Sequence, residues 1–280
     1  MELGWPDDYP SAASLRREVE AMAESVTEAV LDSVPSSELI GLYVKGSARR
    51  RWDSVIDYVP EISDVDIHIL FRDETCIERR LGTMEAALGL QSGIEDRYRD
   101  KVRSPIHMPR PQLVILNHLL QDPDYSPSPR ESLTTLWGED CAEAAYDEER
   151  ERGLARRRLL SDAEILQVLP FRVVDKPGRY LLTVLRDLTW RVSPAGPRVL
   201  CVRRMPSAEA WSLNRTGVVG ALERLGEEGL AAAYRDFYVS AWSCFLSNYK
   251  DSSAARNAIA AGSEVLRQAS EAAQVGGSAA

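Results

Sequence analysis

Two spacings of hydrophobic residues divide the chain into a mixed region and a helical region. Apolar residues at intervals of three and four predict a helix over 11–31. A short apolar run over 39–44 predicts a strand, and apolar residues alternating with polar ones over 64–71 predict a second. A run over 112–116 with little alternation indicates a third strand, buried on both faces.

Helical spacing dominates the remainder of the chain. It predicts a helix over 75–90 and a charged helical or turn-like stretch over 93–102, before a proline-rich loop over 122–130. Beyond residue 140 nearly every segment is helical, with breaks expected at Pro194, Gly196 and Pro197. We therefore predict an α+β protein. A mixed sheet with flanking helices occupies residues 1–140, an all-helical domain occupies 141–273, and 274–280 form a disordered tail.

Composition excludes several classes of protein. A 44% hydrophobic and 28% charged chain of 280 residues is typical of a globular protein, and its net charge of −9 argues against general nucleic-acid binding. The four cysteines are widely separated and form no CxxC pair, so neither a disulfide framework nor a zinc site is expected. No secretory signal and no apolar run of about 18 residues is evident. We expect a soluble cytoplasmic protein without a membrane partner.

The strongest candidate chemistry lies at the second predicted strand. Asp64 and Asp66 are separated by one residue, so they project from the same face of that strand. Paired carboxylates suit Mg²⁺, which neutralises a triphosphate, although an isolated Asp-x-Asp is more often a solvated polar face. Gly46 and Ser47 end the preceding strand and offer backbone and hydroxyl donors to phosphate oxygens.

The order of these motifs carries a family resemblance. VKGSARR followed by ISDVDIHIL resembles the nucleotidyltransferase superfamily related to DNA polymerase β. Ser63 before the first aspartate and Arg49 after the Gly-Ser pair are similar to its bacterial small-molecule branch. Two departures stand out: Arg50 replaces a common glycine, and Asp64 follows Ser47 by 17 positions, a longer interval than is usual in the family.

The resemblance implies an enzyme that uses Mg²⁺ and ATP. It would transfer a nucleoside monophosphate, AMP before other nucleotides, to a hydroxyl of a small molecule such as an aminoglycoside-like acceptor. Asp64 and Asp66 would be the catalytic and metal-binding residues, and Gly46, Ser47 and Arg49 would bind the nucleotide. Lys45, Arg50 and Arg51 would add contacts to pyrophosphate, or would simply form a solvated basic turn.

The family also carries a third carboxylate, on the strand that corresponds to 112–116 here. Its expected position falls on Gln112 or Leu113, and neither side chain can act as a general base. The remaining candidates for that role are Asp122, Asp124 and His68, although a lone histidine on a strand is more often structural. This gap leaves open an alternative, a nucleotide-binding regulatory protein of the same fold with weak or no catalysis. Transfer of AMP to a protein side chain is a third possibility.

The helical region resembles, more loosely, the C-terminal domain of aminoglycoside adenylyltransferases over 180–186 and 216–225. In that family a lysine just before the second segment binds the nucleotide, and Arg215 is the corresponding candidate. An acidic cluster would attract a cationic acceptor, or would only be a solvated helix face. Its members are Glu139, Asp140, Glu143, Asp147, Glu148 and Glu149. The acceptor, the nucleotide preference, the general base and the oligomeric state stay open.

Overall fold

The computed structural model describes residues 4–143 and 145–275, which divide into two compact units. Of the described residues, the sheet unit comprises 5–51 and 63–143. The helical unit comprises residue 4 and the ranges 52–62 and 145–275. The α+β class, the mixed sheet with flanking helices and the helical C-terminal region are confirmed. The assignment of Trp52–Ile62, which we call the anchor segment, to the helical unit was not predicted.

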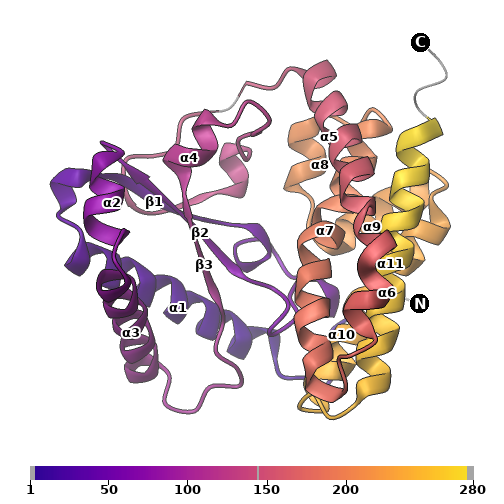
Figure 1. Ribbon diagram of the computed structural model, residues 1–280, viewed down its shortest axis with the longest axis horizontal. Helices are drawn as coiled ribbons and strands as arrows, with labels where there is room; N and C mark the ends of the chain where they lie inside the picture. The colour runs from indigo at the N-terminus through magenta and orange to yellow at the C-terminus, as the bar shows by residue number, and fades with distance from the viewer. Residues whose placement is uncertain (1–3, 144, 276–280) are drawn as a thin grey trace. The chain divides into compact units, whose positions relative to one another are not determined.

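Among the described residues, the sheet has four strands in the order β3-β2-β1-β4, of which β1, β2 and β3 are labelled in Figure 1. Their bounds are Leu39–Lys45 for β1, Val65–Phe71 for β2, Pro111–Ile115 for β3 and Thr134–Gly138 for β4. Strand β1 runs antiparallel to both β2 and β4, whereas β2 and β3 are parallel. The sequence did not predict β4, a five-residue edge strand that pairs only with β1.

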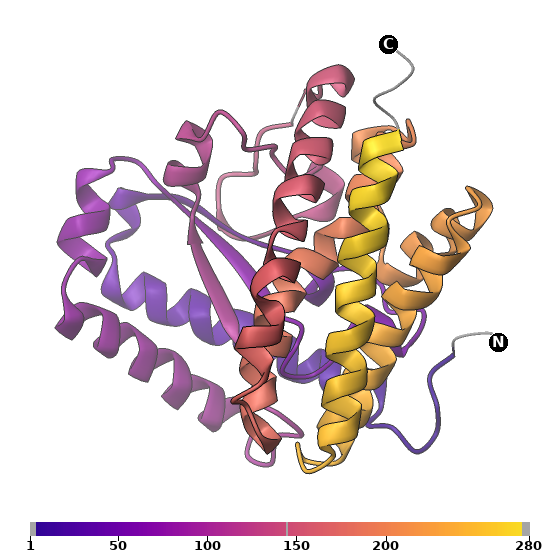
Figure 2. The same cartoon turned by 45° about the vertical axis from the view of Figure 1, so that its right-hand side comes forward.

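One face of the sheet is covered by helices α1 (Ala12–Ser33) and α3 (Met84–Lys101), which lie side by side in Figure 1 and Figure 2. The apolar residues Val65, Ile67 and Ile69 of β2 are fully buried, and they alternate with the polar residues of the other face. The short helices α2 (Thr75–Leu81) and α4 (Leu116–Gln121) complete the unit. A single helix over 75–90 was expected, but Thr83 caps a new helix and separates α2 from α3.

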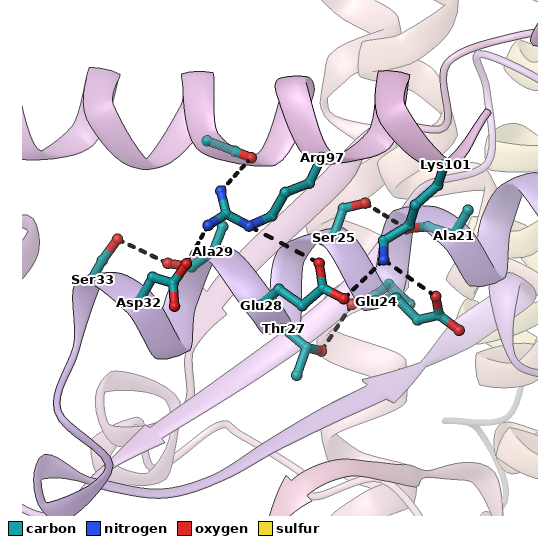
Figure 3. A network of polar contacts seen from close by, with 12 residues as sticks. Ala21, Glu24, Ser25, Thr27, Glu28, Ala29, Asp32, Ser33, Arg97 and Lys101 are labelled. Atoms are coloured by element: carbon teal, nitrogen blue, oxygen red, sulfur yellow. Dashed lines mark hydrogen bonds and ion pairs between the residues drawn. The ribbon is translucent and has the colours of Figure 1, made fainter. Parts of the chain in front are cut away.

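Charged side chains join α1 to α3 along their outer edge (Figure 3). Arg97 pairs with Asp32 and approaches Glu28, while Lys101 Nζ lies 2.8 Å from a Glu28 oxygen and 3.7 Å from a Glu24 oxygen. Ion pairs as exposed as these contribute at most about 1 kcal/mol each. They orient the two helices more than they stabilise them.

The helical unit is built around α7, α10 and α11, and α11 lies alongside the other two (Figure 1 and Figure 2). A side chain at Gly262 of α11 would press against the ring of Phe237 in α10, so these helices pack closely. In the described part of the unit, the α-helices are α5 (Glu148–Ala163), α6 (Ile165–Val173), α7 (Leu181–Val202), α8 (Ser207–Ser212), α9 (Arg215–Arg224), α10 (Glu228–Leu246) and α11 (Ser252–Val275). Helix α11 extends two residues past the predicted end of the domain at 273. Residues 276–280 of the predicted tail lie outside the described residues.

The predicted break at Pro194, Gly196 and Pro197 is wrong, because α7 runs through all three residues. A proline inside a helix removes the N–H that would bond to the carbonyl four residues earlier. For Pro197 that carbonyl belongs to Ser193, and it accepts the hydroxyl of Tyr234 instead, at 3.0 Å. A partner from α10 therefore satisfies the carbonyl that the proline leaves.

The anchor segment is a buried part of the helical unit. Residues 55–59 are at most 4% exposed, and Trp242 of α10 donates its indole N–H to the carbonyls of Val55 and Tyr58 at 2.6 and 3.1 Å. The Asp57 carboxylate accepts the backbone N–H and the hydroxyl of Thr216 at 2.9 and 2.8 Å. These contacts give a physical reason for the long interval between the Gly-Ser and Asp-x-Asp motifs.

Membrane-spanning helices are not found in the described part of the chain, where no helix combines the required length with the required hydrophobicity.

Candidate functional site

The Gly-Ser motif forms a tight turn at the end of β1. Gly46 has a φ of +74°, a conformation that side chains with a Cβ rarely adopt, and residues 46–48 form a single 3₁₀ turn. A Cβ at this position would also collide with Oδ2 of Asp66. The positive φ therefore favours glycine, and the turn lies directly against the second carboxylate of the Asp-x-Asp motif.

Lys45 faces the same carboxylate from the neighbouring strand. The antiparallel register pairs Lys45 with Asp66, and Lys45 Nζ lies 3.4 Å from the hydroxyl of Ser128 in the proline-rich loop. Burial lowers the pKa of Lys45, and the nearby Asp66 charge partly opposes that shift. The loop that follows β3 thus returns to the end of β1.

Asp64 is held by an arginine that sequence reasoning missed. Nε of Arg110 donates to Asp64 Oδ1 at 2.7 Å, and the second guanidinium nitrogen contacts Oδ2, giving a bidentate pair. The Asp64 side chain is 13% exposed and that of Arg110 is 38% exposed. Arg110 immediately precedes β3, and its carbonyl accepts the N–H of Val65. The parallel register that pairs Val65 with Pro111 places Arg110 beside Asp64 when both strands are extended back by one residue.

Gln112 is one of the two positions, with Leu113, at which the family resemblance implies a third carboxylate. The parallel register of β2 and β3 pairs Asp66 with Gln112, so their side chains leave the same face of adjacent strands. An amide can accept through its oxygen and donate through its nitrogen, but it cannot take a proton as a base. The Gln112 amide therefore lies beside Asp66 as a carboxylate would, but it cannot act as a general base there.

The three alternative bases are unequal. His68 is 3% exposed, and burial, reinforced by the Lys45 charge, lowers its pKa to about 3, which makes it a weak base at neutral pH. Asp122 and Asp124 come after α4, beyond the carboxyl end of β3, whereas Asp64 lies at the amino end of the parallel strand β2. Asp122 accepts the N–H of Asp124 at 2.8 Å, as in a local turn.

Arg49 lies apart from the two aspartates. Its Nε donates to the hydroxyl of Thr134 at 2.9 Å, and its side chain lines a cavity together with Val44. Val44 pairs with Ile67, whose side chain projects from the face opposite to that of Asp66. Ser47, by contrast, follows Gly46 within the same turn. The structure therefore brings Gly46, but not the Arg49 side chain, against the Asp66 carboxylate.

The comparisons with known proteins add no relative. The chain matches no protein-family model, no curated protein and no solved structure. The family resemblance accordingly rests on the residues of the two motifs and on how the sheet arranges them.

Arg215, the nucleotide-binding candidate of the helical region, is only 8% exposed and makes contacts inside the helical unit. It donates to the carbonyl of Ile56 at 3.0 Å, and its guanidinium carbon lies 4.0 Å from the centre of the Tyr238 ring. These contacts hold the anchor segment against α9 and α10. They explain the burial of this arginine without a ligand.

Proposed function

We propose that this protein is a Mg²⁺-dependent nucleotidyltransferase that moves AMP from ATP to a hydroxyl of a small molecule. The observation that carries the proposal is the contact between the Gly46 turn and Asp66. Two motifs that are distant in sequence meet at the adjoining ends of β1 and β2. Backbone N–H groups of such a turn can cradle phosphate oxygens, and the cation of Lys45 lies on the adjacent strand position.

The donor set beside the turn suits a hard cation. Asp64 and Asp66 offer carboxylate oxygens, and Gln112 offers an amide oxygen next to Asp66, all of which Mg²⁺ accepts. Within residues 4–143 and 145–275, however, no three His, Cys, Asp or Glu side chains are grouped as metal ligands. Asp66 with Gln112 would hold the ion, and Asp64 would join when Arg110 shares or releases it. Bound Mg²⁺ would neutralise charge on the triphosphate.

Each residue of the site has a separate role in binding Mg-ATP. The Gly46 turn orients the phosphates, Lys45 adds positive charge, and Arg110 fixes the position of Asp64. Gln112 cannot take the proton from the hydroxyl group of the small molecule. The site therefore supports binding of Mg-ATP better than it supports rapid transfer of AMP.

Calorimetric titration with Mg-ATP tests the site directly. We expect the Asp64→Ala/Asp66→Ala double variant to lose measurable binding while it remains folded. The matched control, Asp122→Ala/Asp124→Ala, removes the same charge from the loop beyond α4 and should bind like the wild type. Equal affinity in the wild type and the Asp64/Asp66 variant would contradict the site assignment.

A second candidate function is a nucleotide-binding regulatory protein without efficient catalysis, which the Asp66–Gln112 pairing favours. Release of pyrophosphate from Mg-ATP, measured with a panel of small polyhydroxylated amines, separates the two functions. A transferase releases pyrophosphate only when an acceptor is present. A regulatory protein binds Mg-ATP and releases none with any acceptor of the panel. In that case, we expect Gln112→Glu to be the variant that gains release.

A further inference from the structure

The sheet unit contains a cavity on the face opposite to Asp64 and Asp66. It has a volume of about 480 Å³ and lies between α1 and the strands β1 and β4. Apolar side chains form its floor: Val19, Ala23, Val44, Ala48 and Leu136. The volume falls within the range of small-molecule sites, which run from roughly 300 to 1,000 Å³.

Small residues on α1 create this space. Ala23 and Thr27 are one helical turn apart, and both line the cavity on the side where α1 passes β4. The larger residues of α1, such as Met22 and Val26, are at most 1% exposed and belong to the packed core of the unit. The edge strand β4 is therefore left with an open groove beside it.

Charge is distributed unevenly along the groove. Arg16 and Arg49 line the end near the Gly46 turn, because Arg16 donates to the carbonyls of Ala48 and Arg50 there. Glu20 and Glu24 follow on the same helix, about 6 and 12 Å farther from Arg16 at a rise of about 1.5 Å per residue. The groove is thus basic at one end and acidic toward the other.

The partners of these side chains show which of them are available to a ligand. Arg16 uses two guanidinium nitrogens on the turn, whereas Arg49 uses Nε on Thr134 and keeps its terminal nitrogens for other acceptors. Glu24 is 67% exposed and lies 3.7 Å from Lys101. Glu20 forms no ion pair with any residue that the structure describes.

From this polarity we propose that the groove binds a small zwitterion with an aliphatic body. Its anionic group contacts Arg49, its ammonium group contacts Glu20 and Glu24, and its hydrocarbon covers Ala23 and Leu136. A chain of about five or six carbons spans the distance of one to two helical turns, roughly 6 to 12 Å, between the charged ends. This site is separate from the proposed nucleotide site and does not depend on it.

Titration of the full chain with three six-carbon probes tests the proposal, in the absence of nucleotide. The probes are 6-aminohexanoate, hexanoate and hexylamine, and binding is followed by two-dimensional amide NMR. We expect 6-aminohexanoate to bind at least about tenfold more tightly than either singly charged probe, with shifts at Ala23, Thr27 and Val44. Equal affinities for the three probes, shifts elsewhere, or no binding of 6-aminohexanoate would overturn it.

Two variants sharpen the test. Glu20→Gln should weaken the binding of 6-aminohexanoate by about fivefold or more and leave the binding of hexanoate unchanged, because only 6-aminohexanoate carries an ammonium group. Glu85→Gln removes an equal charge from an exposed position on α3 and serves as the control. A loss of affinity as large in the control as in Glu20→Gln would also overturn the site.

Discussion

Replacing Arg110 with glutamine should increase the affinity of the sheet unit for a divalent metal ion. The guanidinium engages both carboxylate oxygens of Asp64, so a metal must displace it or share those oxygens with it. Hydrogen bonds to charged groups contribute about 1.5–3 kcal/mol when well buried. Arg110 is 38% exposed, and solvent screening reduces its share to about 1–2 kcal/mol. Removing this competitor should strengthen metal binding about 5- to 30-fold.

Titration with Mn²⁺, detected by electron paramagnetic resonance without nucleotide, measures the effect. The control is Arg103→Gln, which removes the same charge from an exposed position in the segment before β3 and should change the affinity little. In an Asp64→Asn background the gain from Arg110→Gln should vanish, because the contested carboxylate is gone. A Mn²⁺ affinity that is unchanged or weaker in Arg110→Gln would refute the idea that Arg110 competes with the metal ion for the Asp64 carboxylate.

Three further predictions concern the turn, the anchor segment and a surface ion pair. Gly46→Ala should cost at least about 1 kcal/mol of stability in urea unfolding and weaken Mg-ATP binding, because its φ is positive and a Cβ would displace Asp66. Asp57→Ala should lower the free energy of unfolding by about 3–5 kcal/mol, because it strands buried donors that include the Thr216 N–H. Arginine hydrogen bonds, that from Arg80 foremost, lower the pKa of Glu38 from 4.5 to about 2. Glu38→Gln should therefore be less stable than the wild type above pH 4.5, and the difference should disappear as the pH falls toward 2.

Each of these variants has a control or a simple contradictory outcome. Gly89→Ala places a methyl group in open space on α3 and should not destabilise the protein. Asp100→Ala removes an exposed carboxylate and should stay within about 0.5 kcal/mol of the wild type, in contrast to Asp57→Ala. For Glu38→Gln, a stability difference that is the same at pH 6 and pH 2 would contradict the linkage.

Periodicity alone was sufficient for the class of the fold. The alternation in β2 and the apolar run of β1 reflect local burial, which a sequence displays directly. The predicted burial of the third strand on both faces is wrong, because β3 lies at the edge of the sheet and its residues are only half-buried. The family resemblance left Gln112 and Leu113 as alternatives, and the parallel register of β2 and β3 shows that Gln112 is the one that pairs with Asp66. Gly46 and Asp66 were placed together on the order of their motifs and the family resemblance, and the structure brings them into contact.

The features that sequence reasoning missed depend on partners that are far away in the chain. Helix α7 continues past Pro197 because a tyrosine of α10 supplies the missing donor, and no local pattern encodes that contact. The anchor segment looks irregular in sequence, yet Trp242 and Thr216 bury it. Arg110 follows the same principle, since its importance depends on pairing with Asp64 across two strands.

The distribution of charge in the sheet unit also bears on how a nucleotide would enter. Arg110 balances Asp64, and Lys45 lies opposite Asp66, so each carboxylate already has a cation beside it. Such a site has little net charge with which to attract a bare metal ion, whereas Mg-ATP brings its own cation together with phosphates that can engage Lys45 and the turn. In the proposed function, metal and nucleotide should therefore bind together rather than in sequence. The wild type should bind Mn²⁺ weakly in the absence of ATP and much more tightly in its presence. Arg110→Gln should reduce the difference between these two affinities, because it should strengthen Mn²⁺ binding in the absence of ATP.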